Sequence, residues 1–479
     1  MALRCWVLAG PLRMLDPDEA VTGLMAQRIA RGQGYLYFAG QRYMGALEQY
    51  LQAPFAALAP GNALILRLPQ LALSGVACAL VYRIGRRLYG GRRAALAAWL
   101  FAAGPAFNLV YGVKSRGAYE ASVVVGLLGL LIAVRHEEGR HEKGTAAMFG
   151  LCCGLAGWLS PTAAFLLVPA LWWLLGAHWR GPVRAALAAV AGGTLGAVPL
   201  LAGWLRTGAT SGVGTTAAST TFAHRLRGLA DPVLAEFLGL RWRAGQSILP
   251  GTVVAVGVAA LAVGWLTAAC RRRRGLRALV LLRAGERRPV DLLLLTVPTS
   301  VALYLAAPYT WYTAEPRYLF ALYPVLALGL AGVLPSRGRP SLAVGSAAVL
   351  LTAGLAVTTL ATHRVDYSRD LLLAADYLHA AGERDVYADY QVAFPLDYYS
   401  RGRVVAVPYS ANGGRFPDLA RSVATASHVG YAVLDSDAAL VAARLAAAGA
   451  TFHSRRFGAI TVFTAVRPAR RPAQLLLSH

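Results

Sequence analysis

Long apolar runs separated by short basic links make up the first three quarters of the chain. A helix that crosses a bilayer needs about 20 mainly apolar residues. Ten segments meet this requirement, at roughly 64–84, 94–112, 118–134, 145–160, 161–178, 184–205, 250–270, 290–308, 318–334 and 341–362. Residues 1–15 are apolar but short, and they resemble the outer half of an eleventh span whose start is truncated or lies upstream. The pattern predicts a mainly α-helical, polytopic transmembrane bundle of about 10–11 spans.

The pattern changes after residue 362, where short helical and β-rich runs alternate. The expected helices are 369–381, 390–400, 415–426 and 437–448, and the expected strands are 385–389, 403–408, 429–434, 450–456 and 459–464. Such alternation is typical of a small layered α/β domain. We therefore expect a transmembrane domain over 1–362, with an outer first loop at about 16–62, and a soluble α/β domain over 363–479.

Composition and charge agree with a membrane protein. The chain is 57% hydrophobic and only 15% charged, with a net charge of +24, whereas a soluble domain is usually about a quarter charged. The basic residues gather in alternate links, at 83–93, 135–143, 178–184, 271–288 and 335–339. The positive-inside rule assigns these links to the cytoplasm. The basic balance therefore indicates membrane topology and no nucleic-acid partner, and it places the first loop and residues 363–479 on the extracytoplasmic face.

Three acidic residues open the first loop. In Asp16-Pro17-Asp18-Glu19, Asp16 is a candidate helix N-cap, and Pro17 would take the first helical position. Asp18 and Glu19 then favour the helix dipole. The same residues also form a carboxylate pair at the membrane surface, one of which could act as a general base. The two interpretations are compatible, because a capped helix would hold the base in place.

Other candidate residues lie in the same loop and in later outer links. Glu48 either faces water or is a third acidic group that orients the base or binds a cation, and Arg42 and Tyr43 before it are candidate substrate-binding residues. Two cations, Lys114 and Arg116, stand on the outer side against the positive-inside trend. They either reach lipid headgroups or neutralise a phosphate leaving group.

A late outer link carries Glu315, Arg317 and Tyr318, either as an ion pair at a helix start or as part of a site. Carboxylates and cations therefore project on one face of the membrane. A site that joins a hydroxyl acceptor to a phospho-sugar needs these parts: a carboxylate removes the proton, and cations stabilise the departing phosphate. The sugar would pass through an oxocarbenium-like state.

Three stretches carry a resemblance to a known family. They are Asp16-Pro17-Asp18-Glu19-Ala20-Val21 with Ala30-Arg31-Gly32, Tyr43 to Leu51, and Glu315-Pro316-Arg317-Tyr318-Leu319 with Tyr323-Pro324. Over about 16–335 the chain resembles the GT-C superfamily of polytopic glycosyltransferases. It is most similar to bacterial members of glycosyltransferase family 39, the dolichyl-phosphate-mannose–protein mannosyltransferase-like group.

The resemblance implies inverting transfer of a sugar, mannose being the family's commonest label, from a polyprenyl-phosphate donor outside the cytoplasmic membrane. The acceptor would be a protein, a glycolipid or a polysaccharide. The resemblance assigns the base to Asp18, support to Glu19, and phosphate binding to Lys114, Arg116 and Arg317.

The chain also departs from the family. Aminoarabinose-transferring relatives carry Glu-Lys-Pro where Gly45-Ala46-Leu47 stands, so that the equivalence of Glu48 is left open. No cofactor is certain: a divalent metal occurs in some relatives, and His224 is the single candidate ligand.

Two other classes of protein compete with a glycosyltransferase. A transporter or lipid flippase should carry charged or helix-breaking residues at mid-membrane, but acidic residues are nearly absent from the middle of the apolar runs. A non-catalytic envelope-assembly protein should tolerate replacement of Asp18 by asparagine without loss of function.

Overall fold

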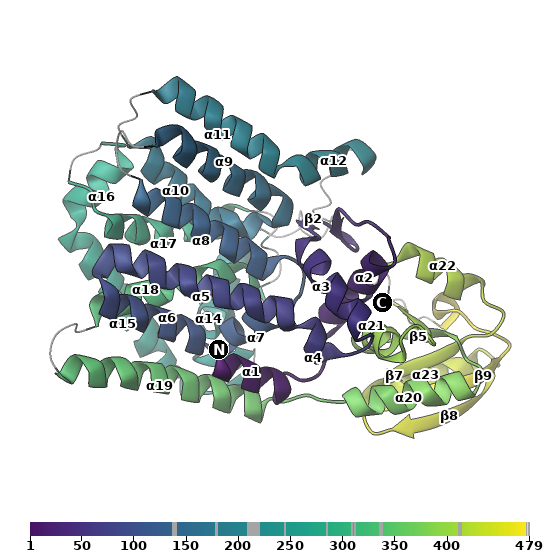
Figure 1. Ribbon diagram of the computed structural model, residues 1–479. Helices are drawn as coiled ribbons and strands as arrows, with labels where there is room; N and C mark the ends of the chain where they lie inside the picture. The colour runs from purple at the N-terminus through teal and green to yellow at the C-terminus, as the bar shows by residue number, and fades with distance from the viewer. Residues whose placement is uncertain are drawn as a thin grey trace.

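The computed structural model describes all residues except 137–140, 178–180, 208–220, 244–245, 284–285, 308–309, 311–312, 335–338, 411–413, 476 and 478–479. Four of the predicted basic links, at 135–143, 178–184, 271–288 and 335–339, lie partly outside the described residues. The remainder forms a helical bundle with a small sheet domain at one end (Figure 1).

The helices of the bundle coincide with the predicted apolar runs. They are α5 (Leu68–Tyr89), α6 (Gly91–Ala103), α7 (Ala106–Val113), α8 (Tyr119–Arg135), α9 (Glu142–Leu159), α10 (Ala164–Leu175), α11 (Pro182–Gly196), α12 (Val198–Thr207), α15 (Gly251–Arg271), α17 (Pro289–Ala306), α18 (Tyr323–Val333) and α19 (Arg339–Thr362). Between them lie α13 (Phe222–Gly228), α14 (Leu234–Phe237), α16 (Arg273–Val280) and a short hairpin of β3 (Arg241–Arg243) and β4 (Gln246–Ser247).

Fewer of these helices are long enough to span a membrane than the sequence predicts. Within the described residues four helices qualify by length and apolar composition, or six if each of two bent pairs counts as one span. The other predicted runs are helical but shorter or more polar. Two of them are shortened because a 3-10 turn precedes the α-helix, beginning at Pro161 in one and at Arg317 in the other. The segment 1–15 forms only α1 (Ala2–Ala9).

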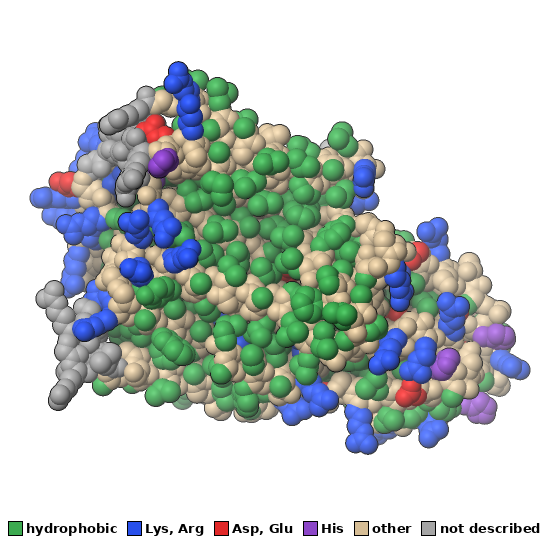
Figure 2. Space-filling model, viewed as in Figure 1, with side chains coloured by type: hydrophobic (Ala, Val, Ile, Leu, Met, Phe, Trp, Pro, Cys, Tyr) green, Lys and Arg blue, Asp and Glu red, His purple; other side chains and the backbone are tan. Residues whose placement is uncertain are grey.

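Exposure shows which surface faces lipid. Helix α15 is apolar up to its last residue, Arg271, yet none of its residues is fully buried. An apolar helix with so much exposed surface is stable in hydrocarbon, where its backbone groups bond to one another and its side chains meet lipid. Figure 2 shows the same feature on one face of the molecule, where an apolar band without basic side chains separates two basic ends. The protein is therefore a multi-pass membrane protein.

A sharp bend in the bundle prepares the site. Helices α6 and α7 meet at 80°, because Gly104 adopts a positive φ of 32° and Pro105 follows it. The break frees backbone carbonyl groups, and the Asn108 amide donates to one of them, Phe101 O, at 2.7 Å. Compensation of this kind is required inside a membrane protein. The bend directs the end of α7 toward the first loop.

The first loop is folded. It contains α2 (Pro17–Ala30), a hairpin of β1 (Tyr37–Phe38) and β2 (Gln41–Gly45), α3 (Leu47–Leu58) and α4 (Ala63–Leu66). Most of α2 is buried, between the bundle and the C-terminal domain. This loop therefore forms the centre of the molecule (Figure 1).

The C-terminal part is a five-stranded sheet of order β6-β5-β7-β9-β8. Its elements are α20 (Ser368–Ala380), β5 (Asp385–Ala388), α21 (Tyr390–Ser400), β6 (Val405–Pro408), α22 (Pro417–Thr425), β7 (Gly430–Leu434), α23 (Asp435–Ala447), β8 (Thr451–Phe457) and β9 (Ile460–Arg467). β5 pairs in parallel with β6 and β7, while β9 is antiparallel to β7 and β8. Each predicted element is present within three residues of its expected bounds, and the predicted fold class is confirmed.

One apolar core joins this sheet domain to the first loop. The same cluster of buried residues contains Leu24 and Met25 of α2 together with Val392 and Leu396 of α21. Helix α21 thus packs directly against α2, which fixes the sheet domain relative to the loop that carries the candidate carboxylates.

Candidate active site

The N-terminus of α2 carries the first two carboxylates. Asp16 is the N-cap: its Oδ1 accepts from the Glu19 N–H at 3.0 Å, while Glu19 Oε2 accepts from the Asp16 N–H at 3.4 Å. The predicted cap, with Pro17 in the first turn, is therefore present. The reciprocal capping box fixes the direction of both side chains.

Glu19 is buried and doubly paired. Arg67 donates from Nε to Oε1 at 2.7 Å and from Nη2 to Oε2 at 2.6 Å. Lys114 Nζ lies 3.0 Å from Oε2 and also donates to Met14 O at 2.7 Å. A buried carboxylate is tolerated only when it is paired in this way. Glu19 is thus enclosed by two cations.

Asp16 connects this pair to the next cation. Arg116 approaches Asp16 Oδ2 with Nε at 2.8 Å and Nη2 at 2.7 Å, and Lys114 Nζ lies 3.3 Å from the same oxygen. Burial by itself would raise the pKa of Asp16, but the charges of Arg116 and Lys114 outweigh it and hold that pKa well below its usual range. Asp16 is therefore ionised at neutral pH.

Glu315 is approached by Arg317 of its own segment and by cations from two other segments. Its Oε2 accepts from the Tyr111 hydroxyl at 2.7 Å and lies 3.5 Å from Arg317 Nη2 and 4.0 Å from Arg116 Nη1. Its Oε1 lies 3.5 Å from Arg243 Nη2. Burial would raise the pKa of Glu315, but the charges of Arg116 and Arg317 lower it below the ordinary value. Three arginines therefore surround one carboxylate.

We call these side chains the ion cluster. It consists of Asp16, Glu19, Glu315, Arg67, Lys114, Arg116, Arg243 and Arg317. Five cations share three carboxylates, so that an excess of two positive charges is present. Arg243 and Arg317, with side chains 53% and 25% exposed, give the cluster a face accessible to solvent.

Asp18 stands beside this cluster. Its side chain is 28% exposed, and Oδ1 accepts from Tyr390 Oη at 3.1 Å and from Arg415 Nη2 at 2.9 Å, both from the C-terminal domain. Tyr43 feels charges from both sets of residues: burial raises the pKa of its hydroxyl, the charges of Arg415 and Arg317 oppose that rise, and the charge of Asp18 adds to it. The structure thus brings the predicted residues Asp18, Tyr43 and Arg317 together.

The other predicted residues make different contacts. Glu48 is buried, and it accepts from the Ser115 hydroxyl at 2.8 Å and from the Ala121 N–H at 3.0 Å. Glu48 therefore links the 114–117 loop, through Ser115, to the start of α8. Arg42 is exposed on β2, where its charge acts on Tyr37, and Tyr318 is buried with its ring against Tyr304.

Several residues of the site were not predicted. Arg67 had a usable signal, since a lone arginine within an apolar run is costly unless it has a partner. Arg243, Tyr390 and Arg415 had none, because they come from a basic loop and from a distant domain.

A metal site does not follow from the described residues. In that part of the chain, no three His, Cys, Asp or Glu side chains are close enough to hold a metal ion. The single candidate ligand, His224, lies with Nε2 3.4 Å from the Thr313 hydroxyl. The cluster carboxylates Asp16, Glu19 and Glu315 all face cations. We therefore derive no step through a metal.

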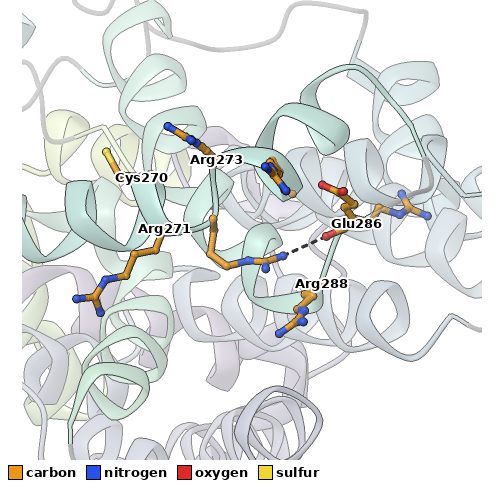
Figure 3. Close-up of a pocket in the computed structure, with 9 residues that line it drawn as sticks. Cys270, Arg271, Arg273, Glu286 and Arg288 are labelled. Atoms are coloured by element: carbon orange, nitrogen blue, oxygen red, sulfur yellow. Dashed lines mark hydrogen bonds between the residues drawn. The ribbon is translucent and has the colours of Figure 1, made fainter.

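A basic cavity of about 610 Å³ lies far from these carboxylates, where α15, α16 and the start of α17 meet. Its lining comprises Cys270, Arg271, Arg272, Arg273, Arg274, Gly275, Glu286, Arg287 and Arg288. Arg271, Arg273 and Arg288 point in different directions (Figure 3), and Arg272 is held by Asp291 at 2.7 Å. The labelled arginine side chains do not converge on one point. We therefore interpret the cavity as a space within the basic link between α15 and α17, and we do not assign the active site to it.

The comparisons with known proteins agree on the fold. Residues 46–206 match the family model described as dolichyl-phosphate-mannose-protein mannosyltransferase. The structure resembles the crystal structure of ArnT from Cupriavidus metallidurans bound to undecaprenyl phosphate, with a TM-score of 0.64 and 13% identity over 97% of both chains. The apo state of that protein gives a TM-score of 0.61 and 12% identity, over 94% of this chain and 93% of that one.

A more distant similarity is to the Archaeoglobus fulgidus oligosaccharyltransferase in complex with Zn and sulfate. Its TM-score is 0.50 at 14% identity, over 90% of this chain and 65% of that chain. No curated protein matches the sequence significantly.

The chain therefore has the GT-C fold, as its sequence predicts. The family-39 resemblance is confirmed by the family model over 46–206. That range contains Glu48, Lys114 and Arg116, whereas Asp18, Glu19 and Arg317 lie outside it. Their place in the site follows from the geometry given above.

Proposed function

We propose that the chain is a membrane glycosyltransferase that moves a hexosyl group from a polyprenyl-phosphate donor to a hydroxyl acceptor. The observation that carries this proposal is the positively charged ion cluster beside the partly exposed carboxylate of Asp18. A polyprenyl phosphate is an anion at the membrane surface, and the solvent-accessible arginines of the cluster suit its phosphate. The GT-C fold supports the proposal.

The proposed reaction is a single displacement. Asp18 removes the proton from the acceptor hydroxyl, whose oxygen attacks the anomeric carbon of the sugar. The bond between that carbon and the phosphate oxygen breaks, and the electron pair leaves with the polyprenyl phosphate. Lys114, Arg116 and Arg317 stabilise the charge on this leaving group. Attack opposite to the leaving group inverts the anomeric carbon.

The remaining candidates take supporting roles in this proposal. Glu19 fixes Lys114 by a 3.0 Å contact, and Glu48 holds the 114–117 loop through Ser115. Glu315 orients Arg317 and Arg116. Tyr43, Arg42 and Tyr318 would contact or frame the substrates.

Orientation and localisation complete the proposal. The predicted basic links assign the Arg271–Arg274 end to the cytoplasm. The ion cluster and residues 363–479 are then extracytoplasmic, at the cytoplasmic membrane of a bacterial cell. Mannose is the first sugar to test, and protein, glycolipid and polysaccharide are the acceptor classes.

The test is sugar transfer in proteoliposomes with a panel of labelled polyprenyl-phospho-sugars. Wild type is compared with Asp18→Asn and with Asp376→Asn, a matched control whose carboxylate is 62% exposed and pairs with Arg403 at the surface. We expect Asp18→Asn to lose transfer by at least 100-fold and Asp376→Asn to keep it.

Each contrary outcome has a defined meaning. Full activity in Asp18→Asn would show that Asp18 is not the general base, and Glu19 and Glu48 would be tested next. Movement of the donor lipid across the bilayer without formation of a glycosylated product would indicate that the protein is a lipid flippase and not a transferase. Neither transfer nor movement in a well-folded wild type would favour an assembly role.

A further inference from the structure

The C-terminal domain docks on the first loop through specific contacts. The hydroxyl of Tyr399 accepts from the Leu15 N–H at 3.3 Å, and that of Tyr398 donates to Asn62 O at 3.4 Å. Arg28 of α2 pairs with Asp418 of α22 at 2.9 Å. These contacts lie just before α2, at its last turn and at the start of α4, so the docked domain reaches both ends of the helix that carries Asp18.

One cation of this domain is directed at Asp18. Arg415 precedes α22, and its side chain is only 11% exposed. Its Nη2 donates to Asp18 Oδ1 at 2.9 Å and to Tyr390 Oη at 3.0 Å, and its Nη1 donates to Ala39 O at 3.4 Å. The amide oxygen of Gln41, turned toward the guanidinium, accepts from both nitrogens at 2.8 and 3.0 Å. Arg415 is thus held by several acceptors.

The two carboxylate oxygens of Asp18 differ in their hydrogen bonds. Oδ1 receives both donors of the C-terminal domain, Tyr390 Oη and Arg415 Nη2. In the described part of the chain, Oδ2 receives no hydrogen bond. A carboxylate fixed by one oxygen presents the other in a defined direction, which is what proton removal from a bound hydroxyl requires.

Resting on the proposed function, we propose that Arg415 and Tyr390 are positioning residues of the active site, which orient Asp18 so that Oδ2 faces the acceptor hydroxyl. The C-terminal domain is then a part of the transferase site. Without Arg415 the carboxylate keeps only the hydrogen bond from Tyr390 on Oδ1 and loses a neighbouring cation, so its direction is less well fixed. The consequence is a slower chemical step with little change in donor binding, because the cations of the ion cluster are untouched.

The test compares Arg415→Gln, Arg415→Lys and Tyr390→Phe with Arg403→Gln. Arg403 is a matched control, because it belongs to the same domain and pairs with Asp376 at 2.8 Å on the surface, away from Asp18. Steady-state transfer is measured in proteoliposomes at one fixed pH for all variants. We expect Arg415→Gln to lower kcat about 10- to 100-fold while the KM for the donor changes less than about threefold.

The separate effects on kcat and KM distinguish positioning from docking. Loss of the guanidinium removes one of the two donors that fix Asp18 Oδ1, so kcat should fall while the KM for the donor is kept. Arg415→Lys keeps a cationic donor at this position and should recover part of kcat. A variant that merely loosens the domain would lower the amount of folded protein, and its kcat per folded molecule would match that of Arg403→Gln.

The outcomes distinguish this inference from the function on which it rests. If wild type transfers sugar and Arg415→Gln behaves as Arg403→Gln in kcat and in the KM for the donor, the positioning role is wrong and the proposed function stands. If Arg415→Gln does not fold, Tyr390→Phe and Arg415→Lys decide by the same two readouts. If the wild type transfers no sugar from any donor, both proposals fail.

Discussion

Arg67 holds the carboxylate of Glu19 by two hydrogen bonds, of 2.7 and 2.6 Å, and each of the two side chains is 1% exposed. This pair anchors the start of α2 to the junction between α4 and α5. The same guanidinium donates to Arg13 O and Met14 O. The first loop and the bundle are therefore joined by a buried ion pair beside the candidate base.

Replacement of Arg67 by glutamine should destabilise the fold strongly. Loss of one partner of a buried pair costs about 3–5 kcal/mol, and since Lys114 would remain 3.0 Å from Glu19, we expect a loss near the lower limit. Thermal unfolding in lipid nanodiscs measures it. The control is Arg456→Gln, whose side chain is 66% exposed and pairs with Asp435; a similar fall in Tm for both variants would contradict the prediction.

A Gly23→Ala change should loosen the contact between α2 and α21. A Cβ at Gly23 would collide with the ring of Tyr398, and overpacking of this kind costs about 1–3 kcal/mol. Gly329→Ala in α18 is the control, since nothing lies within 4 Å of the added Cβ and alanine favours a helix. Faster proteolytic release of residues 363–479 from Gly23→Ala alone is the expected result.

Glu48 should make stability depend on pH. Burial raises its pKa from 4.5 to about 7, although the hydrogen bonds from Ala121 and Ser115 lower it in part. The folded state therefore keeps a proton that the unfolded chain releases, so stability is full below about pH 4.5 and declines until about pH 7. The loss is on the order of 3 kcal/mol.

A Glu48→Gln variant tests this dependence, because glutamine does not titrate. Wild type and variant are unfolded thermally at pH 5, 6, 7 and 8. The Tm difference between them should change up to pH 7 and then stay constant. Parallel curves over the whole range would mean that Glu48 does not take up a proton in the folded protein.

Arg116→Gln should weaken binding of the donor's lipid phosphate. Arg116 contacts Asp16 at 2.7 Å and lies 4.0 Å from Glu315, so it orders the cluster as well as charging it. A hydrogen bond to a charged group contributes about 1.5–3 kcal/mol, which corresponds to a 10- to 100-fold rise in Kd for undecaprenyl phosphate by titration calorimetry. Arg271→Gln, at the basic cavity, is the control. An equal loss in both would indicate unspecific attraction.

Much of the architecture follows from the sequence alone. The length of the apolar runs specifies helices that need a lipid environment, and the alternation after residue 362 specifies the strands and helices of the sheet domain. The Asp16–Glu19 capping box is also local, since its groups are three residues apart. Local and periodic features of this kind are set by neighbouring residues, so that sequence suffices to predict them.

The partners of the charges were decided only by the tertiary structure. The apolar pattern places Asp18, Lys114 and Arg317 on one side of a membrane, but it cannot say which cation meets which carboxylate. Asp18 meets Arg415, which is 397 residues away, because α21 packs on α2 through a shared apolar core. Similarly, Arg67 reaches Glu19 because the chain turns at α4. Such pairs depend on how helices pack, and packing is a property of the whole chain.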